Sequence, residues 1–235
     1  MRNLLTIFKD HLDKTGSKKG REENFLGLGS QIKEIEEQVE IIKNNDILSR
    51  YFKNASYDRE IAQRTLPDGA EGWFAIPRWE KIHADYESAV KIIILSIGYM
   101  KLTKDFWDHI STIGPLRQRS RKVKAFHKIK QQEENDILVV PCQFSSRQGL
   151  SIVEFELGIF DILAILLTHL EREEKNNFLQ AFACAGDNFV SIDKKSTEKI
   201  PLLYSFRNNT IRLNSVSLGW NWNNQKIKVP TGFLI

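Results

Sequence analysis

The stretch LGIFDILAILLTHL, residues 157–170, is the longest strongly apolar run in the chain, and it predicts a buried helix. The run includes Asp161, Thr168 and His169, and its 14 residues fall short of the roughly 20 that a membrane-spanning helix requires. We therefore expect a helix in the centre of a protein core, with no membrane as a partner.

Strand signals lie on both sides of this helix. Ile137 to Val140 is a short, β-branched run closed by Pro141, and Ile152 to Phe155 is a second apolar run. The clearest signal is the pair Leu202 to Phe206 and Ile211 to Val216, joined by RNNT (207–210). Asparagine tolerates the left-handed backbone of a tight turn, so the sequence predicts a β-hairpin there.

Helical patterns dominate upstream. Residues 3–14 predict an amphipathic helix, and the glycine-containing residues 15–30 predict a flexible linker. Ser30 is a candidate N-cap for an acidic amphipathic helix over 30–43, with a further helical region over 47–52. A third helix is expected from Tyr86 to about Gly98.

An aromatic segment separates these helices. The sequence PDGAEGWFAIPRW (67–79) indicates a turn at Pro-Asp-Gly, followed by three large apolar anchors, Trp73, Phe74 and Trp79. The order of elements favours an α+β fold with a helical N-terminal half and a strand-rich C-terminal half that holds one buried central helix and the C-terminal β-hairpin. We expect an N-terminal helical segment over 1–55 and an α+β main domain over 56–235.

Composition limits the class of protein. The chain has 235 residues and 41% hydrophobic side chains, enough for a sizeable core. Charged residues interrupt the first 14 positions, which favours a cytoplasmic protein over a secreted one. The two cysteines, Cys142 and Cys184, lie in apolar surroundings and are expected to be buried, reduced thiols.

Positive charge is concentrated in one segment. The formal net charge is +4, but RQRSRKVKAFHKIK (117–130) holds seven basic residues and no acid, and the other 221 residues carry 27 basic and 30 acidic side chains. Val123, Phe126 and Ile129 are spaced for a helix with one narrow apolar edge. A helix of this kind would offer several contacts to a phosphate backbone.

The leading hypothesis is therefore a non-enzymatic protein that binds nucleic acid or a nucleoprotein assembly by salt-sensitive electrostatic contacts, without sequence preference. A solvated helix face is the competing interpretation of the same charges. The candidate nucleic-acid-binding residues are Arg117, Arg119, Arg121, Lys122, Lys124, Lys128 and Lys130.

A second hypothesis is a protein-protein interaction module. It would use the acidic helix over 30–43 together with exposed aromatic residues, and aromatic residues concentrate at interface hot spots. Asn221, Asn223 and Asn224 indicate a partly exposed loop around Trp220 and Trp222, which are the candidate partner-binding residues.

A third hypothesis is a Mg²⁺-dependent nuclease. Asp187, Asp193 and Lys195, with Glu154 or Glu156, could hold the metal ion and stabilise a phosphodiester transition state. A turn rich in Asp, Asn and Lys explains the same residues without any chemistry.

Other chemistry has weaker support. Cys142 with His127 or His169 could form a nucleophile-base pair, but a buried structural cysteine is the favoured interpretation. The histidines lack metal-ligand spacing, and no phosphate-binding glycine motif occurs. We assign no catalytic residue, no metal ligand and no cofactor.

Three segments carry a resemblance. EGWFAIPRWEKI (71–82), VVPCQF (139–144) and EFELGIFDILAILLTHLER (154–172) are similar to segments of uncharacterised bacterial proteins. The resemblance covers about half of the chain and implies a bacterial cytoplasmic origin. It implies no activity and transfers no site residues.

Overall fold

The computed structural model describes residues 32–97, 115–119, 134–144, 151–169, 181–190, 198–206, 210–217 and 227–234. Its helices are α2 (Ile35–Asn44), α3 (Ser49–Phe52), the 3₁₀ turn η1 (Ile61–Gln63), α4 (Trp79–Ile82), α5 (Tyr86–Ser96) and α8 (Ile159–Thr168). Its strands are β1 (Gly72–Pro77), β2 (Leu116–Gln118), β3 (Ile137–Gln143), β4 (Glu154–Glu156), β5 (Ala181–Ala183), β6 (Asp187–Phe189), β7 (Lys199–Phe206), β8 (Thr210–Ser217), β9 (Ile227–Lys228) and β10 (Thr231–Phe233). The protein is an α+β fold, as predicted.

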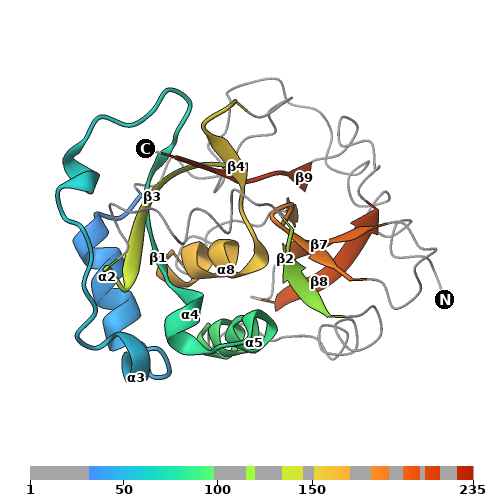
Figure 1. Ribbon diagram of the computed structural model, residues 1–235, viewed down its shortest axis with the longest axis horizontal. Helices are drawn as coiled ribbons and strands as arrows, with labels where there is room; N and C mark the ends of the chain where they lie inside the picture. The colour runs from blue at the N-terminus through green and yellow to red at the C-terminus, as the bar shows by residue number, and fades with distance from the viewer. Residues whose placement is uncertain are drawn as a thin grey trace.

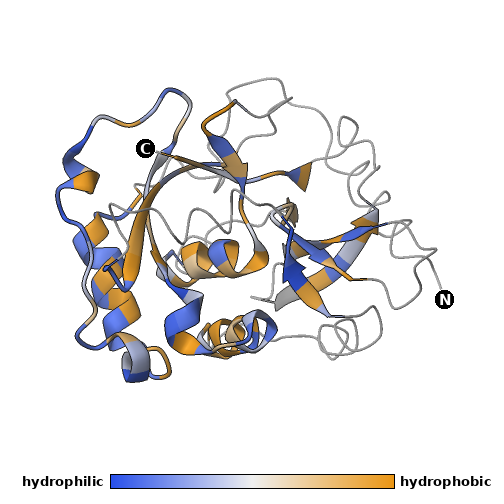
Figure 2. Ribbon diagram, viewed as in Figure 1, coloured by the Kyte–Doolittle hydropathy of each residue, from blue (hydrophilic) through white to orange (hydrophobic). Residues whose placement is uncertain are grey.

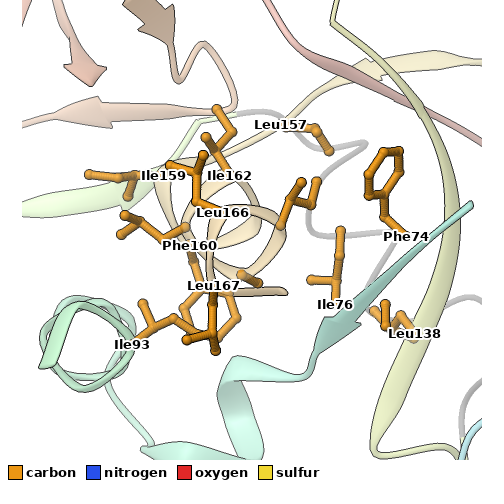
Figure 3. Close-up of a cluster of buried hydrophobic side chains, with 14 of the residues drawn as sticks. Phe74, Ile76, Ile93, Leu138, Leu157, Ile159, Phe160, Ile162, Leu166 and Leu167 are labelled. Carbon is orange, nitrogen blue, oxygen red and sulfur yellow. The ribbon is translucent and has the colours of Figure 1, made fainter. Parts of the chain in front are cut away.

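Helix α8 forms the centre of the core. All ten of its residues are buried, which confirms the prediction of a buried helix. Figure 3 shows its apolar side chains facing Phe74 and Ile76 of β1, Leu138 of β3 and Ile93 of α5. A helix that is apolar around most of its circumference requires apolar partners on several sides. Figure 2 shows α8 as mainly hydrophobic with a hydrophilic interruption, and the helix includes Asp161 and Thr168.

Two sheets lie on either side of this helix (Figure 1). One sheet has the strand order β1-β3-β10-β4, and the other has the order β2-β6-β7-β5-β9 with β8 paired to β7. Strands β7 and β8 pair antiparallel from Lys199↔Ser217 to Phe206↔Thr210, so the predicted β-hairpin is confirmed.

Helix α2 covers the free edge of β1. Its stripe of Ile35, Val39 and Ile42 is buried in the same apolar cluster as α8. Gln38 lies on this buried side, where its Nε2 donates to Trp73 O at 2.9 Å and its Oε1 accepts from Ala75 N at 2.9 Å. One amide side chain thus satisfies a backbone acceptor and a backbone donor of an edge strand, which would otherwise be unpaired inside the protein.

Helix α3 joins the same core through Leu48 and Phe52, so packing continues across the domain boundary predicted near residue 55. The chain breaks between α2 and α3 at Asn45, whose Oδ1 accepts from Ile47 N and Leu48 N at 3.1 and 3.0 Å. Helix α3 lies within the helical region predicted over 47–52. The predicted N-cap at Ser30 is wrong, because residues 32–34 are non-helical and Glu34 precedes the first helical residue.

Two strands differ from the prediction. Strand β1 was not predicted as a strand, because it lies within the segment predicted to be turn-rich; it pairs with β3 from Gly72↔Cys142 to Pro77↔Ile137. The turn itself is correct, since Ala70 N donates to Pro67 O and Gly69 has φ 91°. Strand β3 continues through Pro141 to Gln143, and β10 pairs only with its last two residues, Cys142 and Gln143. Proline is tolerated where a strand has a neighbour on one side.

Gly186 is expected to be intolerant of any side chain. A Cβ on this residue would lie 2.6 Å from Glu156 O and 2.7 Å from Gly158 N, which are backbone atoms that cannot rotate away. We expect Gly186→Ala to lower the free energy of unfolding by about 3 kcal/mol through overpacking. Urea unfolding measures this loss, and Gly20→Ala, the same chemical change in the predicted linker, should cost less than about 0.5 kcal/mol. An equal effect of the two substitutions would contradict the close packing.

Candidate functional site

The basic segment begins on an edge strand. Within the described residues, β2 pairs only with β6, in the register Leu116↔Phe189, Arg117↔Asn188 and Gln118↔Asp187. Leu116 is buried and Arg117 is exposed, as alternation along a strand requires. The helix predicted from residue 117 is therefore wrong for Arg117 and Gln118, because pairing with β6 overrides the local helical spacing.

Arg119 is the one cation of the candidate set with partners among the described residues. Its Nε lies 3.6 Å from Glu198 Oε1, and its Nη1 donates to Ala185 O at 3.3 Å. Both side chains of this ion pair are partly exposed, so the pair contributes little to stability. The other candidate residues, Arg121, Lys122, Lys124, Lys128, Lys130, Trp220 and Trp222, lie outside the described residues.

A buried carboxyl group lies on β6, the strand paired with β2. Asp187, the first residue of β6, has no exposed surface. Its Oδ2 accepts from Tyr86 Oη at 2.7 Å and from the backbone N of Ile159, in the first turn of α8, at 2.7 Å. The carboxyl group therefore joins α5, α8 and β6. We call Asp187 and its neighbours Tyr86, Gly158, Asp161 and Gln118 the Asp187 junction.

The junction contains a second buried acid, Asp161, in the first turn of α8. Its Oδ2 accepts from Gly158 N at 3.1 Å, which satisfies one backbone donor at the helix N-terminus. Burial raises the pKa of Asp161 to about 7; the hydrogen bond from Gly158 opposes this shift, and the charge of Glu80 adds to it.

The pKa of Asp187 is also raised, chiefly by burial and further by the charge of Asp161. The hydrogen bonds from Ile159 N and Tyr86 oppose this effect. Burial and the two acids likewise raise the pKa of the Tyr86 hydroxyl. The surroundings of the junction therefore favour the uncharged forms of Asp161, Asp187 and Tyr86. The pKa of each aspartate lies above the range usual for that residue.

Two polar atoms of the junction lack partners within the described chain. Asp187 Oδ1 and Gln118 Nε2 are both buried without a hydrogen bond. The two residues are directly opposite each other in the β2-β6 ladder, so their side chains share a face of the sheet. Asp187 Oδ1 also lies against Gly158, where a Cβ would approach it to 2.7 Å. The close fit requires glycine at this position.

The structure describes only some of the residues of the nuclease hypothesis. Asp187 is buried in its junction, and Asp193 and Lys195 lie outside the described residues. Glu154 is also buried, and its Oε2 accepts from Ser151 N at 3.0 Å. Among the described residues, no group of three His, Cys, Asp or Glu side chains is arranged to hold a metal ion.

The cysteines are confirmed as buried, free thiols. Burial is the main cause of a raised pKa at Cys142 and at Cys184, and nearby carboxylates add to it. A raised pKa disfavours the thiolate, the opposite of what a nucleophile needs. His169 is the residue directly after α8, with Nδ1 3.0 Å from Ile165 O, and it is buried against the ring of Phe74.

In the part of the chain that the structure describes, no helix combines the length and the apolar character needed to cross a membrane. Comparisons with protein-family models, with curated proteins and with solved structures find no match to this chain. The functional argument therefore depends on the residues of this chain alone.

Sequence reasoning considered Asp187 as a Mg²⁺ ligand or as part of a polar turn, and so missed the junction. The available signal was Asp161, a single acid at the third position of an otherwise apolar helix, three residues after Gly158. That spacing is typical of an acid that satisfies backbone donors at a helix N-terminus.

Proposed function

We propose that this protein binds nucleic acid, or the nucleic acid of a nucleoprotein assembly, through the basic segment (residues 117–130). The observation that carries the proposal is the charge distribution, in which this segment holds seven basic residues and no acid while the rest of the chain is slightly acidic. A local excess of cations attracts a polyanion by releasing its condensed counterions.

Two structural features support this proposal. The segment starts at the exposed Arg117 on β2, an edge strand, so its first cation faces solvent. Arg119 is matched by Glu198, which leaves six basic residues of the segment as the candidate contacts. The apolar stripe of α2, by contrast, is buried in the core, which leaves mainly acidic side chains on the outer surface of the helix proposed for protein binding.

We expect Arg121, Lys122, Lys124 and Lys128, changed together to glutamine, to weaken binding to a labelled duplex and to a labelled single strand by at least about tenfold at low salt. The slope of log affinity against log salt should fall in magnitude by up to about 3.6, since each lost phosphate contact removes about 0.9 from a duplex. Fluorescence anisotropy titrations at several salt concentrations measure both quantities.

A matched control removes the same number of charges elsewhere. Arg50, Lys53, Arg59 and Arg64 are exposed basic residues of the described N-terminal part. Their change to glutamine lowers the net charge equally but should leave most of the affinity intact. Equal losses from the two variants would mean that only total charge matters, and absence of binding by the unmodified protein at low salt would eliminate the proposal.

A further inference from the structure

The outer face of the β2-β6 pair carries polar side chains at the start of the basic segment. Neighbouring residues of a strand point to opposite faces, so the exposed Arg117 lies on the side of β2 away from the buried Leu116. Arg117 is directly opposite Asn188 of β6, and the two side chains therefore share this outer face. Arg119 N donates to Gly186 O, which continues the pairing beyond β2 and places the Arg119 side chain on the outer face as well.

Two of these side chains converge on one carboxylate oxygen. Glu198 Oε1 accepts a hydrogen bond from Asn188 Nδ2 and lies 3.6 Å from Arg119 Nε. The guanidinium of Arg119 is also fixed by the backbone, because its Nη1 donates to Ala185 O at 3.3 Å. An amide donor and a guanidinium that meet at one oxygen form a binding site for an anion, and the carboxylate of Glu198 occupies this site.

The Glu198 carboxylate is weakly held there. The side chains of Glu198 and Arg119 are 40% and 29% exposed, so water and salt screen their attraction. A phosphodiester group resembles a carboxylate, since each carries one negative charge shared between two terminal oxygens. Arginine and asparagine side chains are common donors to the phosphates of nucleic acids. The donors that hold Glu198 are therefore equally suited to a backbone phosphate.

We infer that the outer face of the β2-β6 pair is a phosphate-binding site that the protein's own Glu198 occupies, and that Glu198 thereby keeps the nucleic-acid backbone from Arg119. The inference rests on the proposed function, because it takes nucleic acid as the ligand, and it adds a residue that limits the affinity. Arg119 and Asn188 are the donors of the site, and the exposed Arg117 flanks it. Removal of the Glu198 charge makes Arg119 available as a further phosphate contact.

Glu198→Gln tests the inference, because glutamine keeps an oxygen for Asn188 but has no charge to attract Arg119. In fluorescence anisotropy titrations with a labelled duplex, we expect this variant to bind about threefold more tightly than the unmodified protein at low salt. The slope of log affinity against log salt should increase in magnitude by about 0.9, the value of one added phosphate contact. Glu36→Gln, which removes the same charge from an exposed position of α2, is the matched control and should leave the slope unchanged.

The same titrations in an Arg119→Gln background show whether the gain depends on Arg119. We expect Glu198→Gln to give no gain in this background, so the two substitutions should be non-additive. The inference is wrong if the gain persists without Arg119, if Glu36→Gln gives an equal gain, or if Glu198→Gln binds like the unmodified protein. Each of these results leaves the proposed function intact. Absence of binding by both the unmodified protein and Glu198→Gln at low salt would instead remove the proposed function, and this inference with it.

Discussion

Gln38→Ala is expected to lower the free energy of unfolding by about 3 to 5 kcal/mol, one of the two largest effects that we predict. The side chain has no exposed surface and makes three hydrogen bonds to backbone atoms: Nε2 to Lys33 O and Trp73 O, and Oε1 from Ala75 N. Alanine would leave the donor and the acceptor of β1 buried without partners, each at a cost of about 1 to 3 kcal/mol. It would also leave a cavity between α2 and β1.

Urea unfolding followed by circular dichroism measures this loss. Glu36→Gln is the matched control, because it changes an exposed side chain of the same helix and should shift stability by less than about 0.5 kcal/mol. Gln38→Met is informative as well, since it retains most of the volume and removes only the polar contacts. A loss in Gln38→Met far below that of Gln38→Ala would attribute the effect to volume and contradict the role of the amide.

The parts of the fold that were predicted correctly depend on local patterns. A long apolar run predicts helix α8. Two strand-like runs joined by a short polar turn predict the β7-β8 hairpin. Strand β1 was not predicted, because its identity depends on pairing with β3, whose partner residues lie 60 to 70 positions further along the chain. Two prolines and nearby glycines also made its sequence resemble a turn.

In the candidate site, too, local patterns were predicted and long-range contacts were not. The charge of the basic segment is a property of the sequence, but the strand at its start arises from contact with β6. The junction could not be foreseen, because Tyr86, Asp161 and Asp187 come from three separate parts of the chain. Composition alone suggests that Asp187 is a solvated turn residue. Only tertiary packing gives it a buried environment.

The pH dependence of stability follows from the same packing. The pKa of Asp161 is about 7 in the folded protein, and the ordinary pKa of an exposed aspartate is 3.8. Between these two values the folded state binds more protons than the unfolded state, so stability falls as the pH rises from about 4 to about 7. A difference of about three pKa units corresponds to about 4 kcal/mol, which is present below pH 4 and lost above pH 7.

Asp161→Asn is therefore expected to be more stable relative to the unmodified protein at pH 8 than at pH 4, by up to about 4 kcal/mol. Asparagine cannot ionise, and its oxygen can still accept the hydrogen bond from Gly158 N. Urea unfolding at pH values from about 4 to about 8 measures the difference, and Asp46→Asn, which removes an exposed carboxyl group by the same chemical change, is the matched control. Asp187 contributes a slope of the same sign, so some pH dependence should persist in Asp161→Asn. Parallel profiles for Asp161→Asn and the unmodified protein would show that Asp161 keeps its charge in the folded state, and that the junction tolerates a buried carboxylate.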